Sequence, residues 1–177
     1  MTRQSLGLQS GTVVVVDYDN RWPLLFDAEA ARLRDACKSM GLSLEHMGST
    51  AVPGLCAKPV LDILAGHPAT VAALDYVGPF ERAGYEHRGD AGITGHQFFR
   101  RGQPRAYHIH LVERDGPLWH AYVAFRDYLR ANPEAAHQYA ELKRTLAVRF
   151  PRDREAYLEG KSAFVADAIR QANPRSR

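Results

Sequence analysis

An aspartate inside an apolar segment, and a Gly-Ser turn before it, are the residues best suited to chemistry. Asp62 is the one charged residue of segment 60–65. A carboxylate in such surroundings is costly to bury unless a metal ion, a lysine or hydrogen-bond donors compensate it. The turn at Gly48 and Ser49 offers backbone N–H groups and a hydroxyl, which suit phosphate oxygens. We therefore expect Asp62 to hold a divalent ion beside bound phosphate; the structural alternative is an Asp62 that pairs with Lys58.

Histidines supply a second set of candidate ligands. His108 and His110 are two positions apart, so on a strand their side chains point to the same face. With Asp62 they form a set that suits Mn²⁺ or Zn²⁺ better than Mg²⁺, which prefers oxygen ligands. The alternatives for the pair are proton transfer and a plain position on the polar face of an edge strand. We expect His46, next to the turn, and His96, on a neighbouring strand, to support this group.

Cationic side chains near these positions are candidates for phosphate binding. Lys58 stands immediately before Pro59, at the start of the apolar strand, and Lys161 lies in a later helical segment. Arg105 leads into the segment that carries the histidine pair. With the Gly-Ser turn, the expected nucleotide- or phosphate-binding residues are Gly48, Ser49, Thr50, Lys58, Arg105 and Lys161.

The elements that must position these residues follow from hydrophobic periodicity and from Gly and Pro breaks. A strand is predicted at 42–47, ending at the turn, and a buried apolar strand at 59–65. A helix is predicted at 23–40, where apolar residues recur at spacings of three and four, and a short helix at 69–76. The other predicted strands are 13–16, 84–87, 96–101 and 106–112.

The last third of the chain is predicted to be helical. Residues 118–172 divide into three helices at Asn132-Pro133 and Phe150-Pro151, because the residue before proline avoids the α region. We expect Lys143, Arg144 and Lys161 to close one wall of the cleft from these helices. The apolar stripe of the first helix is interpreted as core packing; it consists of Trp119, Tyr122, Phe125, Tyr128 and Leu129.

Composition favours an ordinary globular protein. The chain has 177 residues, of which 45% are hydrophobic and 24% charged, with a net charge of +3. We expect a single domain over 1–177, with a core at about 13–115 and a helical part at about 117–172. The small positive charge and the lack of a basic stripe argue against nucleic acid as the main partner. Short apolar runs argue against membrane spans, so a cytoplasmic location is expected; the sequence does not specify an oligomeric state.

One long motif resembles a known family. Residues 45–55, followed by Ala57-Lys58-Pro59 and Asp62-Ile63, are similar to the GrpB family, as are 107–112, 125–129 and 157–162. The resemblance covers about 13–168. It implies the nucleotidyltransferase fold, an α/β (α+β) arrangement of a mixed sheet flanked by helices, with a cleft for a nucleoside triphosphate. In some chains such a domain is similar to a segment fused to dephospho-coenzyme A kinase, which points toward nucleotide or coenzyme A metabolism.

The chain departs from the pattern of active members of that superfamily. Those members carry two carboxylates two residues apart on the second strand, whereas here the second position is Leu64. A third carboxylate is expected on a neighbouring strand, where this chain has His108 and His110. These departures put standard two-metal nucleotidyl transfer in doubt.

Three functions follow as hypotheses. The first is a nucleotidyltransferase-like enzyme that uses ATP or another nucleoside triphosphate, with Mg²⁺ or Mn²⁺ or else Zn²⁺, to modify or activate a small molecule. In it Asp62, His108 and His110 hold the metal or move protons. The second is a nucleotide- or coenzyme-binding module without transfer activity, which the substitution at Leu64 favours. The third is an acid–base enzyme that needs no nucleotide.

Overall fold

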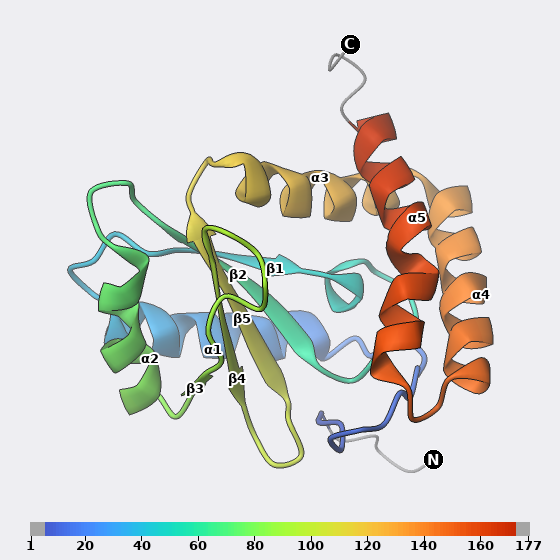
Figure 1. Cartoon of the computed structure of the whole chain (residues 1–177), viewed down its shortest axis with the longest axis horizontal. Coiled ribbons are helices and arrows are strands. Elements are labelled where there is room, and N and C mark those ends of the chain that lie inside the picture. Colours follow the sequence, from blue (N-terminus) through green and yellow to red (C-terminus); the bar gives the residue numbers. More distant parts are fainter. Residues whose placement is uncertain (1–5, 173–177) are drawn as a thin grey trace.

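The computed structural model describes residues 6–172 and places five strands in one mixed sheet (Figure 1). The spatial order is β1-β2-β5-β4-β3. β2 and β5 are parallel, while the pairs β1–β2, β5–β4 and β4–β3 are antiparallel. The bounds are β1 (Ser43–Met47), β2 (Leu61–His67), β3 (Glu86–His87), β4 (His96–Arg101) and β5 (Tyr107–Glu113).

Helices cover both faces of the sheet and extend beyond it. A short 3₁₀ turn, η1 (Ser49–Ala51), follows β1, and another, η2 (Ala73–Tyr76), leads into α2. In Figure 1, α3 crosses above the sheet, and α4 and α5 stand side by side at one end. The α-helices are α1 (Trp22–Ala36), α2 (Val77–Arg82), α3 (Pro117–Ala131), α4 (Pro133–Arg149) and α5 (Arg154–Ala172).

Alternation along β2 and β5 separates an apolar face from a functional face. Leu61, Ile63 and Ile109 are fully buried against α1 and α2, together with Phe26 and Leu33 of α1. Residues between these strand positions point to the opposite face because strand side chains alternate. The parallel register sets Asp62 beside His108 and Leu64 beside His110. One face therefore forms the core, and the other carries the residues singled out from the sequence.

The C-terminal helices pack on the functional face and on the loop after η1. Leu118, Trp119 and Tyr122 of α3 pack against the sheet residues Met47, Leu64 and Val112. Leu55 and Cys56 of the loop pack against Tyr139 and Ala140 of α4. Gly160 lets α5 approach α4 closely, since a Cβ there would lie 2.5 Å from Leu146 Cδ2. The C-terminal helices α3, α4 and α5 thus form walls around the functional face of the sheet.

Three local expectations were wrong. Residues 13–16 do not form a strand: Val16 makes one isolated bridge with Ala57, and Val13 packs against Leu146 and Tyr157 instead. The β-branched run serves to fill space between the sheet loop and the last helices. The short helix predicted at 69–76 begins only at Ala73, as η2, and continues into α2. The helix predicted at 23–40 ends at Ala36.

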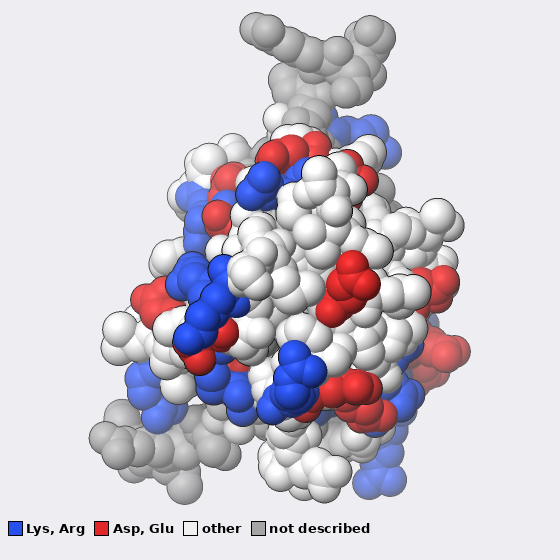
Figure 2. Space-filling model, turned by 90° about the vertical axis from the view of Figure 1, so that its left-hand side faces the viewer, with Lys and Arg blue, Asp and Glu red and all other residues white. Residues whose placement is uncertain are grey.

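Positive and negative side chains are mixed on the face of the molecule that Figure 2 shows. That view, from the α2 side, has Lys and Arg interleaved with Asp and Glu and with uncharged surface. Glu86 of β3, for example, pairs with both Arg88 and Arg100.

No helix within residues 6–172 has the length and apolar character needed to cross a bilayer.

Leu33 and Leu24 of α1 allow a matched test of the core. Leu33 is fully buried, whereas Leu24 is 70% exposed. We expect Leu33→Ala to lower the free energy of unfolding by about 2–5 kcal/mol, because it leaves a cavity. Leu24→Ala, the same change on the same helix, should stay within about 0.5 kcal/mol. Urea unfolding measures both, and equal losses would contradict this assignment of the core face.

Candidate active site

Asp62 lies directly beneath the Gly-Ser turn. Its partner across the antiparallel pair is Met47, so the chain enters the turn at the level of the carboxylate. Gly48 has φ 71° and ψ −170°, a conformation open essentially to glycine alone. A Cβ on Gly48 would lie 2.8 Å from Asp62 Oδ2. Both the backbone angle and the close approach therefore require glycine at this position.

The turn is held from behind by buried polar groups. His46 Nε2 lies 2.9 Å from Thr50 Oγ1, and the His46 ring stacks on Phe26. Burial lowers the pKa of His46 to about 4, so this ring is neutral at physiological pH. Arg130 of α3 donates two hydrogen bonds, of 3.0 and 2.8 Å, to the Ala51 carbonyl. His46 and Thr50 thus brace the turn, and Thr50 also lines the cavity described below.

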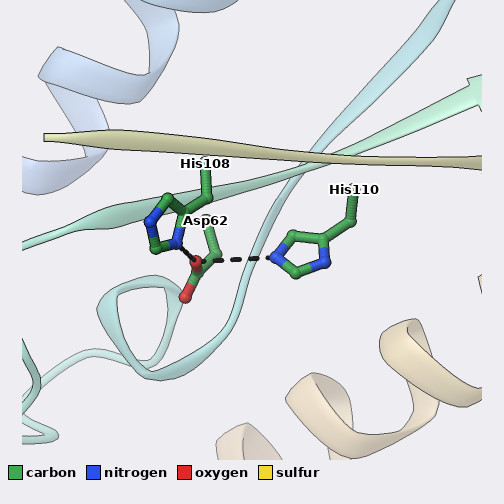
Figure 3. A group of neighbouring side chains, drawn as sticks. All are labelled: Asp62, His108 and His110. Atoms are coloured by element: carbon green, nitrogen blue, oxygen red, sulfur yellow. Dashed lines mark hydrogen bonds and ion pairs between the residues drawn. The ribbon is translucent and has the colours of Figure 1, made fainter. Parts of the chain in front are cut away.

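Two imidazoles flank the Asp62 carboxylate (Figure 3). His108 Nδ1 lies 3.1 Å from Asp62 Oδ1, and His110 Nε2 lies 3.7 Å from the same oxygen. Burial acts to raise the pKa of Asp62, but the interactions with His108 and His110 outweigh it and hold this pKa well below its usual range. Burial lowers the pKa of His108 despite the neighbouring carboxylate. Near neutral pH the group therefore presents a carboxylate next to a neutral His108.

The three side chains form a candidate metal site. One ligand atom from each of Asp62, His108 and His110 can be chosen so that all three lie within 4.8 Å of one another. Carboxylate oxygen and neutral imidazole nitrogen together suit Zn²⁺, Mn²⁺ and related divalent ions. Leu64 does not contribute to the site, because it is fully buried and packs against Met47 and Val112.

A cavity of about 480 Å³ opens over this group, between the sheet and the C-terminal helices. Its volume is in the range of small-molecule sites. Asp62 is the one acidic side chain among the described residues that line it, against four cationic ones. One part of the wall is apolar and comes from α3 and α5. The cationic residues are Lys58, Lys143, Arg154 and Lys161, and the apolar ones include Leu118, Ala121, Phe125, Leu158 and Val165.

Lys143 of α4 connects the helices to the turn. Its Nζ donates to Ser49 Oγ at 2.9 Å and to the Cys56 carbonyl, and it lies 4.7 Å from the centre of the Tyr139 ring. The residue is only 2% exposed. Burial lowers the pKa of Lys143 to about 7, so the neutral and charged forms are both populated near neutral pH. Lys143 can therefore gain a proton when an anion binds next to it.

A second lysine and an aromatic ring face the same cavity from α5. Lys161 Nζ lies 4.8 Å from the centre of the Tyr157 ring, and Lys58 Nζ lies 5.6 Å from the same ring. Burial, followed by the charge of Lys58, lowers the pKa of Lys161 to about 8. Burial also lowers the pKa of Lys58. An anionic ligand would relieve this crowding of positive charge.

Comparison with known proteins identifies the family. The GrpB protein family model matches residues 12–171. The chain belongs to the GrpB family. A UPF0157 protein of Pseudomonas aeruginosa is 42% identical over 172 residues, covering 93% of this chain and 69% of that protein. A dephospho-CoA kinase of Mycolicibacterium paratuberculosis is 30% identical over 186 residues, covering 90% of this chain but 46% of the kinase.

Solved structures agree with this assignment and show the fold. The crystal structure of the conserved protein GrpB from Enterococcus faecalis matches with a TM-score of 0.83 and 35% identity, over 90% of this chain and 96% of that one. A Cid1 poly(U) polymerase bound to MgATP matches with a TM-score of 0.54 and 13% identity, over 76% of this chain and 45% of that one. The GrpB-family chain thus has a nucleotidyltransferase-like fold, as the sequence predicted.

The structure brings most of the sequence-predicted residues to one cavity, but not all. Gly48, Ser49, Thr50, Lys58, Asp62, His108, His110 and Lys161 line it. His46 and His96 lie behind this set, in contact with Thr50 and His110 respectively. Arg105 lines a different hollow, of about 670 Å³, with Arg100 and Arg101. A role for Arg105 at the Asp62 cavity is therefore not supported by its position.

Four residues that line the cavity of this GrpB-family chain were not predicted from the sequence to do so. Tyr139 and Tyr157 were not singled out, and Tyr122 and Phe125 were interpreted as core although they line the cavity. A signal did exist for the first two. A tyrosine precedes a lysine by four positions in both α4 and α5, as Tyr139 with Lys143 and as Tyr157 with Lys161. Residues four apart share a helix face, so each ring can cover its lysine.

Gly48 and Gly54 provide a matched test of the close approach to Asp62. Both have positive φ, at 71° and 78°, but a Cβ on Gly54 would meet nothing within 4 Å. We expect Gly54→Ala to cost about 1–2 kcal/mol of stability through backbone strain alone. Gly48→Ala should cost at least as much and also displace the Asp62 carboxylate. Side-chain NMR signals of Asp62 and His108 report this; unchanged signals in Gly48→Ala would contradict it.

Lys143 predicts a pH dependence of stability. Its folded-state pKa, about 7, lies below its ordinary value of 10.5. Between these values the unfolded chain binds a proton that the folded chain does not, so the contribution of Lys143 to stability rises with pH. Wild type should therefore gain stability relative to Lys143→Met from pH 7 to pH 10, in urea unfolding. Lys38→Met removes an exposed lysine and should show no such gain; a flat difference for Lys143→Met would refute the assignment.

Proposed function

We propose that this GrpB-family protein binds a nucleoside triphosphate with a divalent metal ion and uses them to modify or activate a small-molecule acceptor. The observation that carries the proposal is the position of Asp62. Its carboxylate adjoins the Gly48-Ser49 turn and faces three lysines across one cavity of about 480 Å³. A metal ion and a polyphosphate together match this separation of charge.

Charge balance favours a polyanionic ligand. Four cationic side chains and one carboxylate line the cavity, so positive charge is in excess there, in partly desolvated surroundings. Burial lowers the pKa of Lys58, Lys143 and Lys161 alike. Phosphate oxygens would reverse this effect and restore the charged forms, because a nearby negative charge favours an ammonium ion. Ligand binding by this group should therefore be coupled to proton uptake.

The phosphate-binding positions follow from the contacts. Lys143 already holds the Ser49 hydroxyl at 2.9 Å, which fixes a cation at the turn. Lys161 and Lys58 approach the Tyr157 ring from the α5 side and from the start of β2. We assign the phosphates to the space between Lys143 at the turn and the pair formed by Lys58 and Lys161. The apolar wall of α3 and α5 then receives the nucleobase or the apolar part of the acceptor.

The residues present also fit a divalent metal ion. Asp62, His108 and His110 supply one carboxylate and two imidazoles, whose ligand atoms lie within 4.8 Å of one another. When bound, a divalent ion would neutralise charge on the phosphate oxygens and polarise them. The protein's own contribution is positioning: the sheet fixes Asp62, while Ser49 and the lysines orient the phosphates. The other role open to His108 excludes metal binding: while its Nδ1 donates to Asp62, the lone pair on its Nε2 can accept a proton from an acceptor hydroxyl or amine.

The likeness to Cid1 supports this proposal at the level of the fold. The Cid1 structures include one with MgATP and one with a UTP analogue. We propose that a triphosphate in this chain lies in the cavity between the sheet and the C-terminal helices. Leu64 marks the difference, since it is buried where a second metal-binding carboxylate would stand. We therefore propose one metal ion rather than two.

Substitution of Asp62 tests the proposal. Asp62→Asn keeps the shape of the side chain and removes its charge, so Mn²⁺-dependent ATP binding should weaken at least tenfold, as is usual for a lost metal contact. Asp75→Asn, at an exposed position of η2, serves as the control and should bind like wild type. Calorimetric titration of ATP with and without Mn²⁺ measures the effect, and thermal unfolding verifies the fold. Equal affinities for both variants would exclude Asp62 as the metal-binding group.

A second candidate is a nucleotide- or coenzyme-binding module without transfer activity. Leu64, and the match to part of dephospho-CoA kinases, favour it. Incubation with labelled ATP, Mn²⁺ and a panel of alcohols, amines and acids separates the two functions. Pyrophosphate release or a labelled product identifies the enzyme. Saturable ATP binding with no turnover across the panel identifies the module.

A further inference from the structure

A chain of hydrogen bonds behind the metal site fixes the position of one proton. His96 is 1% exposed, and its Nδ1 lies 3.0 Å from the Asp90 backbone carbonyl. Its Nε2 lies 3.0 Å from His110 Nδ1. A carbonyl oxygen can only accept, so His96 must donate its Nδ1–H to Asp90. The neutral His96 ring then has a lone pair on Nε2.

This lone pair decides which nitrogen of His110 carries hydrogen. Because His96 Nε2 accepts, His110 must donate from Nδ1. With its single proton on Nδ1, the His110 ring leaves Nε2 with a lone pair, and that atom faces Asp62 Oδ1. Two electron-rich atoms face each other at 3.7 Å, which is too long for a hydrogen bond. A cation between them would satisfy both atoms, and that cation can be a metal ion or a second proton on His110.

His108 differs from His110 in this respect. Its Nδ1 is within hydrogen-bond distance of Asp62 Oδ1, at 3.1 Å, so a neutral His108 satisfies the carboxylate by donating. To bind a metal through that nitrogen, His108 must first move its proton to Nε2. His110 needs no such change. The 3.7 Å separation is also close to the roughly 3.3–3.4 Å between two ligand atoms that share a tetrahedral ion at about 2.0–2.1 Å.

We propose that His96, held by the Asp90 carbonyl, presets His110 as a nitrogen ligand, so that the site selects Zn²⁺, Co²⁺ or Mn²⁺ over Mg²⁺. This inference rests on the proposed metal site and adds the class of the ion and the residue that sets it. A nitrogen ligand fixed in its lone-pair form favours ions that accept imidazole, whereas Mg²⁺ favours oxygen ligands and water. His96 is a positioning residue: it touches His110 and not the ion.

The first measurement uses wild-type protein without metal. Long-range NMR on ¹⁵N-histidine-labelled protein distinguishes which ring nitrogen carries hydrogen. We expect His110 in the Nδ1–H form and His96 in the Nδ1–H form as well. His110 found in the Nε2–H form would overturn the inference without any variant being made.

Two variants of His96 then link this proton to metal binding. His96→Gln keeps an amide N–H for the Asp90 carbonyl and an oxygen that can accept from His110. His96→Leu removes the acceptor, so His110 is free to place its proton on Nε2 and bond to Asp62. We expect Co²⁺ affinity to fall about 10–100-fold in His96→Leu, the usual effect of losing such a supporting contact, and to stay near wild type in His96→Gln.

The readouts separate this inference from the proposed function. Calorimetry and the visible absorption of bound Co²⁺ report affinity and coordination without any assay of activity, and competition with Zn²⁺ and Mg²⁺ reports selectivity. Wild-type Co²⁺ affinity in a folded His96→Leu would overturn the role of His96 and leave the nucleotide site in place. Preference for Mg²⁺ in wild type would overturn the ion class. No binding of any divalent ion by wild type would overturn both this inference and the metal requirement of the proposed function.

Discussion

The negative charge of Asp62, held in the second residue of a central strand, is the constraint that organises the functional half of the molecule. Its strand is buried on one face against α1, so the carboxylate cannot turn away to solvent on that side. Gly48 has no side chain and so leaves room for the carboxylate, and the parallel register sets His108 beside Asp62. The turn, the strand register and the histidines thus all meet at this one charge.

The C-terminal helices place positive charge on the other side of the cavity from Asp62. They contribute Lys143 from α4 and Lys161 from α5, each against the face of a tyrosine four residues earlier. An aromatic face stabilises an ammonium ion while excluding water, which partly offsets the cost of burial. In the proposed function, the sheet would supply the ligands for a metal ion, and the helices would supply Lys143 and Lys161 as cations for phosphate. Neither part alone forms the cavity.

The sequence predicted the elements whose evidence is local. Periodicity located the strands that carry Asp62 and His108, and two-residue spacing correctly placed His108 and His110 on one face. The run at 13–16 misled because β-branched residues also fill gaps between elements, as Val13 does against Tyr157. Arg105 was misplaced because strand order does not say into which hollow a residue at the end of a strand points. Lys143 was expected on a wall of the cleft, but its contact with Ser49 depends on packing between elements 94 residues apart.

Leu64 and the two histidines both make the site less negative than one that carries carboxylates at these positions. In the superfamily pattern that the resemblance implies, two carboxylates on one strand and a third on a neighbouring strand hold Mg²⁺, and the cations offset the repulsion between their negative charges. This chain has one carboxylate, with two imidazole rings on the neighbouring strand and a leucine that packs into the apolar layer under α3. In the proposed function, one divalent ion would balance that carboxylate. The positive charge that a second ion would supply to phosphates would then come from the protein, where Lys58, Lys143 and Lys161 line the same cavity.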